Sequence, residues 1–178
     1  MGPAIGLEFA EVRVAPALAL QISGHCAGDP ASLGQAMRDA FEALMSFVTC
    51  HGLIINGDPR AIYTAYDAAG VRFIAALPVA AGPREPVEQS PVIVEMLPEM
   101  QAYRFTHHGP YSQMAQTYGQ ITTFLKDKGL LQSDADWERF LPMWEEYRND
   151  PNTTPPADLL TYIYVRARAG AKTDIPSA

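Results

Sequence analysis

The chain has 178 residues, of which 48% are hydrophobic and 19% charged, and its formal net charge is −7. This is enough apolar material for one domain with a sizeable core, and too much for an intrinsically disordered chain. DNA-binding proteins normally carry a basic face, and no run of Lys and Arg supplies one here, so we expect no direct nucleic-acid binding. The sequence shows neither a signal peptide nor an apolar stretch of membrane-spanning length, which predicts a cytoplasmic protein that does not bind membranes.

The first half of the chain predicts two strands, one helix and two further strands. An extended stretch at residues 11–25 is interrupted by Pro16, which divides it into two strands or bends one. A helix follows, because Asp29 can cap it, Pro30 suits its first position, and apolar residues then recur every three or four positions. Gly52 is placed to end this helix. The predicted strands after this helix are 61–67 and 71–79.

The second half repeats this order. Residues 92–109 form an extended stretch interrupted by Pro98, and a helix begins at Gly109-Pro110 and ends at Gly129. The apolar stripe of this helix is Tyr111, Met114, Tyr118, Ile121 and Leu125. Two strands, 139–147 and 159–168, complete the half.

The repetition predicts an α+β fold built from two pseudo-symmetric strand–strand–helix–strand–strand repeats with antiparallel sheets. The repeats span about 9–79 and 92–168, joined by the polar, proline-rich linker 80–91, in a single domain over 1–178. Two such copies can pair their sheets around a pseudo-two-fold axis. We expect a cleft between the two helices to be the ligand site, since internal interfaces of this kind favour clefts.

The predicted strand 139–147 contains two adjacent glutamates, Glu145 and Glu146, whose side chains must point to opposite faces of a sheet. Glu145 shares its face with Met143 and Tyr147, so we expect it to point inward and Glu146 to lie at the surface. A shift of one residue in register would exchange the two. A carboxylate among aromatic rings has a raised pKa or takes a partner, such as an organic cation or a tyrosine hydroxyl.

Aromatic residues are concentrated in the second half, around this glutamate. The pattern also fits a solvated glutamate with ordinary core aromatics, and both interpretations stay open at this point. The candidate ligand-binding residues are Glu145, Tyr111, Trp144, Tyr147, Tyr103, Phe105, Tyr118, Tyr162, Tyr164 and Met143.

Two stretches, HHGPYSQMAQTYGQITTFLKDKGL and WEEYRNDPNTTPPADLLTYIYV, together resemble the GyrI-like small-molecule-binding domain. This family also supplies the effector-binding domain of AraC- and MerR-type multidrug regulators. The resemblance covers residues about 9–168 and implies aromatic side chains around one glutamate, here Glu145, with Tyr111 as the tyrosine at the helix start. It further implies a site for lipophilic cations. The chain resembles a standalone form, without the DNA-binding segment of the regulators.

Three functions are consistent with these residues. The first is binding of small aromatic or cationic amphipathic molecules. A protein partner is possible, but the sequence does not identify one. The second, which the resemblance allows, is hydrolysis of reactive cyclopropane-bearing natural products, with Glu145 as general acid or base and Tyr111 as a donor to the oxyanion. The third is inhibition of a protein such as a topoisomerase. Histidine and cysteine spacing predicts no metal site, and nucleotide-binding motifs are missing, so we expect no cofactor.

Overall fold

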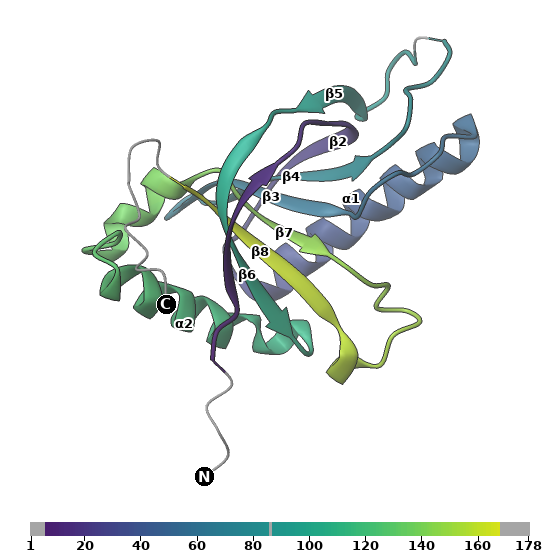
Figure 1. The fold of residues 1–178 in the computed structure, drawn as a ribbon. Coiled ribbons are helices and arrows are strands. Elements are labelled where there is room, and N and C mark those ends of the chain that lie inside the picture. The colour runs from purple at the N-terminus through teal and green to yellow at the C-terminus, as the bar shows by residue number, and fades with distance from the viewer. Residues whose placement is uncertain (1–5, 86, 168–178) are drawn as a thin grey trace.

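The computed structural model describes residues 6–85 and 87–167, which form an antiparallel eight-stranded sheet and two α-helices (Figure 1). The predicted α+β class is confirmed, while the ends of the predicted domain, 1–5 and 168–178, lie outside the described residues. The strands are β1 (Phe9–Val14), β2 (Ala17–Cys26), β3 (Arg60–Asp67), β4 (Gly70–Pro78), β5 (Ile93–Leu97), β6 (Met100–His108), β7 (Met143–Tyr147) and β8 (Leu160–Arg166). The helices are α1 (Pro30–His51) and α2 (Met114–Asp127), with 3-10 turns η1 (Tyr111–Gln113), η2 (Asp134–Phe140) and η3 (Pro156–Asp158).

The strands are ordered β1-β6-β8-β7-β3-β4-β2-β5. If β1 is exchanged with β5, β2 with β6, β3 with β7 and β4 with β8, the same order is obtained, read from the other end of the sheet. A two-fold axis that relates the two halves of the chain requires this property. The edge strands are swapped: β1 pairs with β6 and β5 pairs with β2. The division into two repeats remains a prediction, but the strand order supports it, and it puts β7 and β3 together at the centre of the sheet.

Helix α1 begins and ends where the sequence indicates. The Asp29 carboxylate accepts a hydrogen bond from the Ser32 backbone N–H at 2.9 Å, and Pro30 occupies the first turn, where no N–H is needed. Gly52 ends the helix at φ 60°, a left-handed conformation that glycine adopts without strain. The buried face of α1 packs against β2 and β4 through Met37, Ala40, Leu44, Phe47 and Val48.

Helix α2 is preceded by a short turn. The chain leaves β6 at Gly109, which has φ 112°, and passes through η1 before α2 begins at Met114. Residues Met114, Ile121 and Leu125 of α2 then pack with Phe105 of β6 in a second core cluster. The predicted stripe is therefore buried at these three positions, whereas Tyr111 lies in η1 and is exposed.

Both helices cover the same face of the curved sheet. The cluster under α1 and the cluster under α2 draw on side chains that share this face, such as Ala61 of β3 and Ile163 of β8, and each of these two is the cross-strand partner of Glu145. The opposite face has its own apolar cluster, which includes Trp144 and Tyr164. Strand β7 thus has covered side chains on both of its faces.

Strand β7 is shorter than the predicted strand 139–147. The residues before it form η2, which Ser133 and Asp136 hold by reciprocal side-chain to backbone hydrogen bonds. Asp136 is buried and also forms an ion pair with Arg139 at 3.1 Å. The prediction of a strand from residue 139 was therefore wrong, because local capping outweighs the extended preference of the apolar residues that follow.

Candidate ligand-binding site

Glu145 lies at the centre of the sheet on the face that the two helices cover. Its side chain is only 7% exposed, and its carboxylate accepts three hydrogen bonds from tyrosine hydroxyls. Tyr118 of α2 donates to Oε1 at 2.7 Å, Tyr147 of β7 to Oε2 at 2.9 Å, and Tyr63 of β3 to Oε2 at 3.2 Å. Within the described residues, no Lys or Arg forms an ion pair with this carboxylate, and these three hydroxyls are its hydrogen-bond donors, while His107 adds an electrostatic interaction that favours its charged form.

This environment changes the acid–base properties of the cluster. Burial raises the pKa of Glu145 above its ordinary value of 4.5, although the hydrogen bonds from Tyr118, Tyr147 and Tyr63 act in the opposite direction. Burial, followed by the negative charge of Glu145, raises the pKa of these three tyrosines well above their ordinary value. The hydroxyls therefore stay protonated and act as donors, and the carboxylate is the group that changes charge.

Three aromatic rings form a row beside the carboxylate. The Phe41 ring of α1 meets the Tyr147 ring edge-on, with 6.0 Å between the ring centroids. The Tyr111 ring of η1 also contacts Tyr147, with 5.4 Å between the centroids of these two rings. The row connects α1, β7 and the turn before α2. Tyr111 is 39% exposed, so it is the member of the row most accessible from solvent. Aromatic faces attract cations, and this row lies next to a buried acid.

His107 fixes the start of α2 against β6. Its ring is buried, with Nε2 3.2 Å from the Pro110 carbonyl and Nδ1 2.7 Å from the Thr117 hydroxyl. Because the carbonyl can only accept, Nε2 carries the proton in the neutral ring and Nδ1 accepts from Thr117. The histidine thereby ties η1 and the first turns of α2 to the sheet, which positions Tyr111 and Tyr118.

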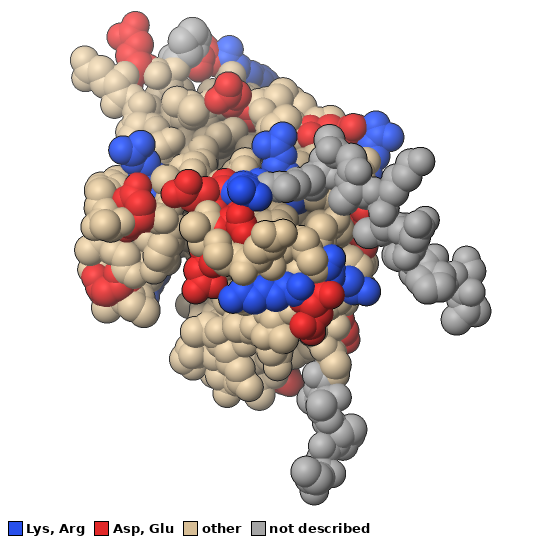
Figure 2. Space-filling view, turned by 90° about the vertical axis from the view of Figure 1, so that its left-hand side faces the viewer, with Lys and Arg blue, Asp and Glu red and all other residues tan. Residues whose placement is uncertain are grey.

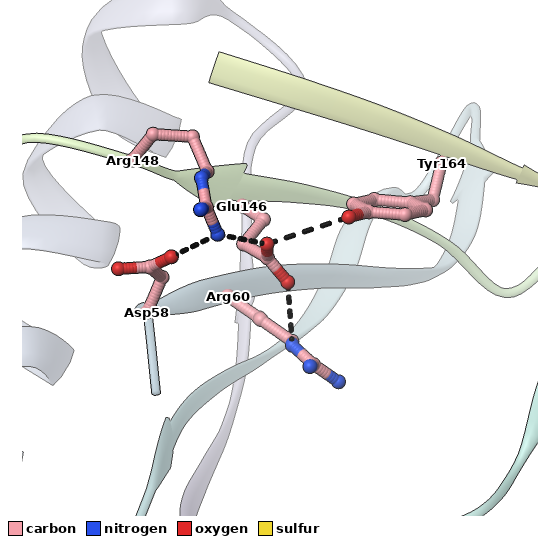
Figure 3. A network of polar contacts seen from close by, with 5 residues as sticks. All are labelled: Asp58, Arg60, Glu146, Arg148 and Tyr164. Atoms are coloured by element: carbon pink, nitrogen blue, oxygen red, sulfur yellow. Dashed lines mark hydrogen bonds and ion pairs between the residues drawn. The ribbon is translucent and has the colours of Figure 1, made fainter. Parts of the chain in front are cut away.

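Glu146 is not at the surface, and that prediction was wrong. It is 6% exposed on the opposite face of β7, where Arg60 Nε donates to its Oε2 at 3.1 Å and Arg148 Nη1 to its Oε1 at 2.9 Å (Figure 3). Tyr164 donates a longer hydrogen bond to Oε1 at 3.4 Å, and Arg148 also pairs with Asp58. Glu146 is buried because the far face of the sheet is packed as well, which alternation along one strand does not reveal.

The structure divides the predicted site residues into three groups. The first, around Glu145, comprises Tyr147, Tyr118 and Tyr111, with Met143 half-buried on the same face of β7. The second comprises Tyr103 and Phe105, which are fully buried in the core under α2. The third comprises Trp144, Tyr162 and Tyr164 on the opposite face, where the Trp144 and Tyr164 rings stack at 4.7 Å.

Two members of the cluster come from the first half of the chain and were not predicted. Tyr63 donates directly to Glu145, and Phe41 contacts Tyr147. The alternation of the strand AIYTAYD places Tyr63 on the same face as Ala61, but only the pairing of β3 with β7 shows that this face adjoins Glu145. The contact thus depends on a pairing between the two halves.

The described residues also bear on metal, membrane and nucleic-acid binding. Their histidine, cysteine and acidic side chains nowhere form a group of three that could hold a metal ion. None of the helices they form is long and apolar enough to cross a bilayer. On the face shown in Figure 2, acidic and basic side chains are interspersed with uncharged surface, and the described residues there form no continuous basic patch.

The described residues thus form an antiparallel sheet under two helices, with a buried acid among tyrosine hydroxyls on the covered face. A family model of the GyrI-like small molecule binding domain matches residues 28–168. The chain belongs to this family, and the resemblance noted in the sequence is confirmed. Comparison with curated protein sequences gave no match.

Solved structures share the fold at low sequence identity. The C-terminal domain of EcmrR superposes with a TM-score of 0.70 at 14% identity, covering 90% of this chain and 96% of that one. In an EcmrR–DNA complex the TM-score is 0.72 at 13% identity, over 93% of this chain and 59% of the EcmrR chain. SAV2435 bound to tetraphenylphosphonium gives 0.59 at 11% identity, with coverage of 90% and 94%. A hydrolase encoded by lin2189 from Listeria innocua gives 0.55 at 13% identity, with coverage of 92% and 93%.

Proposed function

We propose that the domain binds small aromatic cations at Glu145. The observation that carries this proposal is a buried carboxylate whose partners are three neutral hydroxyl groups rather than a Lys or Arg of the described chain. A buried charge without a counter-ion is unfavourable, so a bound cation would supply what the protein does not. The adjacent rings of Tyr147, Tyr111 and Phe41 add faces that attract cations, each contributing about 0.5–2 kcal/mol.

The similar fold of SAV2435 was solved with tetraphenylphosphonium, an aromatic cation of this kind. Tetraphenylphosphonium is therefore a suitable probe, and tetraphenylborate is its control, because it has nearly the same shape and the opposite charge. We expect the phosphonium to bind and the borate not to bind, as measured by isothermal titration calorimetry.

The substitution Glu145→Gln keeps the size of the side chain and removes its charge. We expect it to weaken phosphonium binding by about tenfold or more, equivalent to about 1.4 kcal/mol. Glu146→Gln is the matched control, since it removes the same charge one residue away on the other face, and its affinity should stay within about twofold of the unchanged protein. Equal phosphonium affinity in Glu145→Gln and the unchanged protein would contradict the proposal.

Binding should also depend on pH. A cation favours the ionised form of Glu145, and burial raises the pKa of this carboxyl group, so the unliganded site holds a proton over a wider pH range. Phosphonium affinity should therefore increase as pH rises through the pKa of Glu145. At pH values below this pKa, binding should release one proton. The dependence should disappear in Glu145→Gln.

Hydrolysis is a second candidate function, favoured by the same raised pKa. A carboxyl group whose pKa moves upward from 4.5 approaches the range in which general acids and bases work, and the Tyr118 hydroxyl lies 2.7 Å from it. Tyr111, exposed beside Tyr147, is the candidate donor to a developing oxyanion. Incubation with a cyclopropane-bearing electrophile should show turnover that Glu145→Gln abolishes and Glu146→Gln retains. Turnover that is unchanged in Glu145→Gln would remove Glu145 from the chemistry.

A further inference from the structure

A pocket of about 260 Å³ lies on the sheet face opposite the helices, away from Glu145. Side chains of β3, β4 and β7 contribute to it, as do residues of β5 and the start of β6. Most of its lining is apolar, including Ile62, Ile74, Leu97 and Trp144. Two charged residues also line it, Arg60 and Glu95.

The guanidinium group of Arg60 uses only one of its three nitrogens as a hydrogen-bond donor within the described residues. Its Nε donates to Glu146, and its side chain is only 15% exposed. Among the described residues, neither terminal nitrogen, Nη1 or Nη2, has a hydrogen-bond or ion-pair partner, and in Figure 3 this end of the guanidinium points away from Glu146. An arginine that donates through Nε alone retains the part of its planar fork that suits a second carboxylate.

The charges around Arg60 indicate what that partner would be. Asp58, Arg148, Glu146 and Arg60 form a chain of ion pairs in which the sign of the charge alternates (Figure 3). Arg60 is the last member and lines the pocket, so the alternation would continue with an anion. Glu95 is exposed on β5 and forms no ion pair with Arg60. It adds a negative charge that opposes an anionic ligand.

We propose that this pocket binds a small amphipathic carboxylate. The acid would pair with the terminal nitrogens of Arg60, and the apolar part would lie against Ile62, Ile74 and Trp144. The volume is below the range of about 300–1,000 Å³ that is usual for drug-sized ligands, so a short chain or a single ring fits best. This site lies on the opposite face of the sheet from the cation site and selects the opposite charge, and it does not depend on the proposed function.

Three probes with the same six-carbon chain test the proposal: hexanoate, hexanamide and hexylammonium. Trp144 can report binding by its fluorescence once Trp137, the other tryptophan of the chain, is replaced by Phe. Hexanoate should bind with a dissociation constant on the order of 1 mM, and the other two at least about tenfold more weakly. Equal affinity for all three, or no hexanoate binding at about ten times this concentration, would overturn the proposal.

Variants then locate the bound acid. Arg60→Gln should weaken hexanoate binding by about tenfold or more. Because this change also leaves Glu146 with one partner fewer, Ile74→Phe serves as a second variant that keeps the ion pair and fills the pocket, with the same expected loss. Glu95→Gln should strengthen binding by about two- to threefold, since it removes a like charge.

Glu145→Gln is the control for the other face and should leave the hexanoate affinity unchanged. If Glu145→Gln abolishes hexanoate binding, or if Arg60→Gln and Ile74→Phe both retain it, the acid does not bind in this pocket and the proposal is wrong. Failure of tetraphenylphosphonium to bind would contradict only the function proposed for Glu145.

Discussion

The two faces of β7 bury adjacent glutamates in different ways. Glu146 is matched by Arg60 and Arg148, so its charge is compensated within the protein. Glu145 receives three hydrogen bonds from neutral hydroxyls and no ion pair from the described residues. Two carboxylates with nearly the same exposed fraction thus differ in whether a counter-charge is built in. The charge of the partners, and not burial, is therefore what separates Glu146 from Glu145, the acid for which we propose a bound cation.

The largest expected effect concerns stability. Glu146→Gln would leave Arg60 and Arg148 without their shared carboxylate, and we expect it to lower the free energy of unfolding by about 2–3 kcal/mol. This loss is smaller than the roughly 3–5 kcal/mol typical of a broken buried ion pair, because Arg148 is partly exposed to solvent. Glu145→Gln removes a buried charge that lacks a counter-ion, so its effect should stay within about 1 kcal/mol in either direction. Urea denaturation at neutral pH measures both. If Glu145→Gln lowered the free energy of unfolding more than Glu146→Gln, then Glu145 and not Glu146 would be the acid whose charge stabilises the fold.

The next effect separates the hydroxyl groups on the two faces. Tyr118 donates to Glu145 at 2.7 Å and Tyr164 to Glu146 at 3.4 Å. Hydrogen bonds to charged groups contribute about 1.5–3 kcal/mol when the geometry is good and much less when they are long. Tyr118→Phe should therefore destabilise the protein by about 1–2 kcal/mol, and Tyr164→Phe by about 0.5 kcal/mol or less. Thermal unfolding of the two variants makes the comparison, and equal losses would contradict it.

The smallest effect is the pH dependence of stability. Burial raises the pKa of Glu145 in the folded protein above 4.5, so the folded state holds this proton over a pH range in which the unfolded chain has released it. The contribution of this proton to stability is fully present below pH 4.5 and is lost as pH rises through the pKa of the folded state. Glu145→Gln should flatten this part of the stability curve, measured by urea denaturation at a series of pH values. A curve of unchanged slope would show that Glu145 does not titrate there.

Much of the site on the helix face followed from the local sequence. Alternation along MWEEY placed Glu145 with Met143 and Tyr147, and the helix stripe placed Tyr118 toward the sheet. The caps of α1 at Asp29 and Gly52 were also readable, because capping depends on neighbouring residues. These features share one property, which is that their cause lies within a few residues in the chain.

The features that the sequence did not reveal depend on distant pairings. Tyr63 reaches Glu145, and Arg60 reaches Glu146, only because β3 lies beside β7. Tyr162 and Tyr164 share the face of Trp144 and Glu146 because β8 pairs with β7 in that register, with Tyr164 opposite Trp144 and Tyr162 opposite Glu146. Alternation states which side chains share a face, but it does not state what covers that face.

The swapped edge strands have a consequence for how the chain folds. β1, near the start of the chain, has no partner until β6 has been synthesised, and Phe9 then pairs with Phe105. Contacts between residues so far apart in sequence close large loops and slow folding. Neither half can complete its own sheet, because each provides an edge strand to the other. We therefore expect the domain to fold and unfold as one cooperative unit, and a nascent chain that ends before β6 to leave β1 unpaired and open to association with other chains.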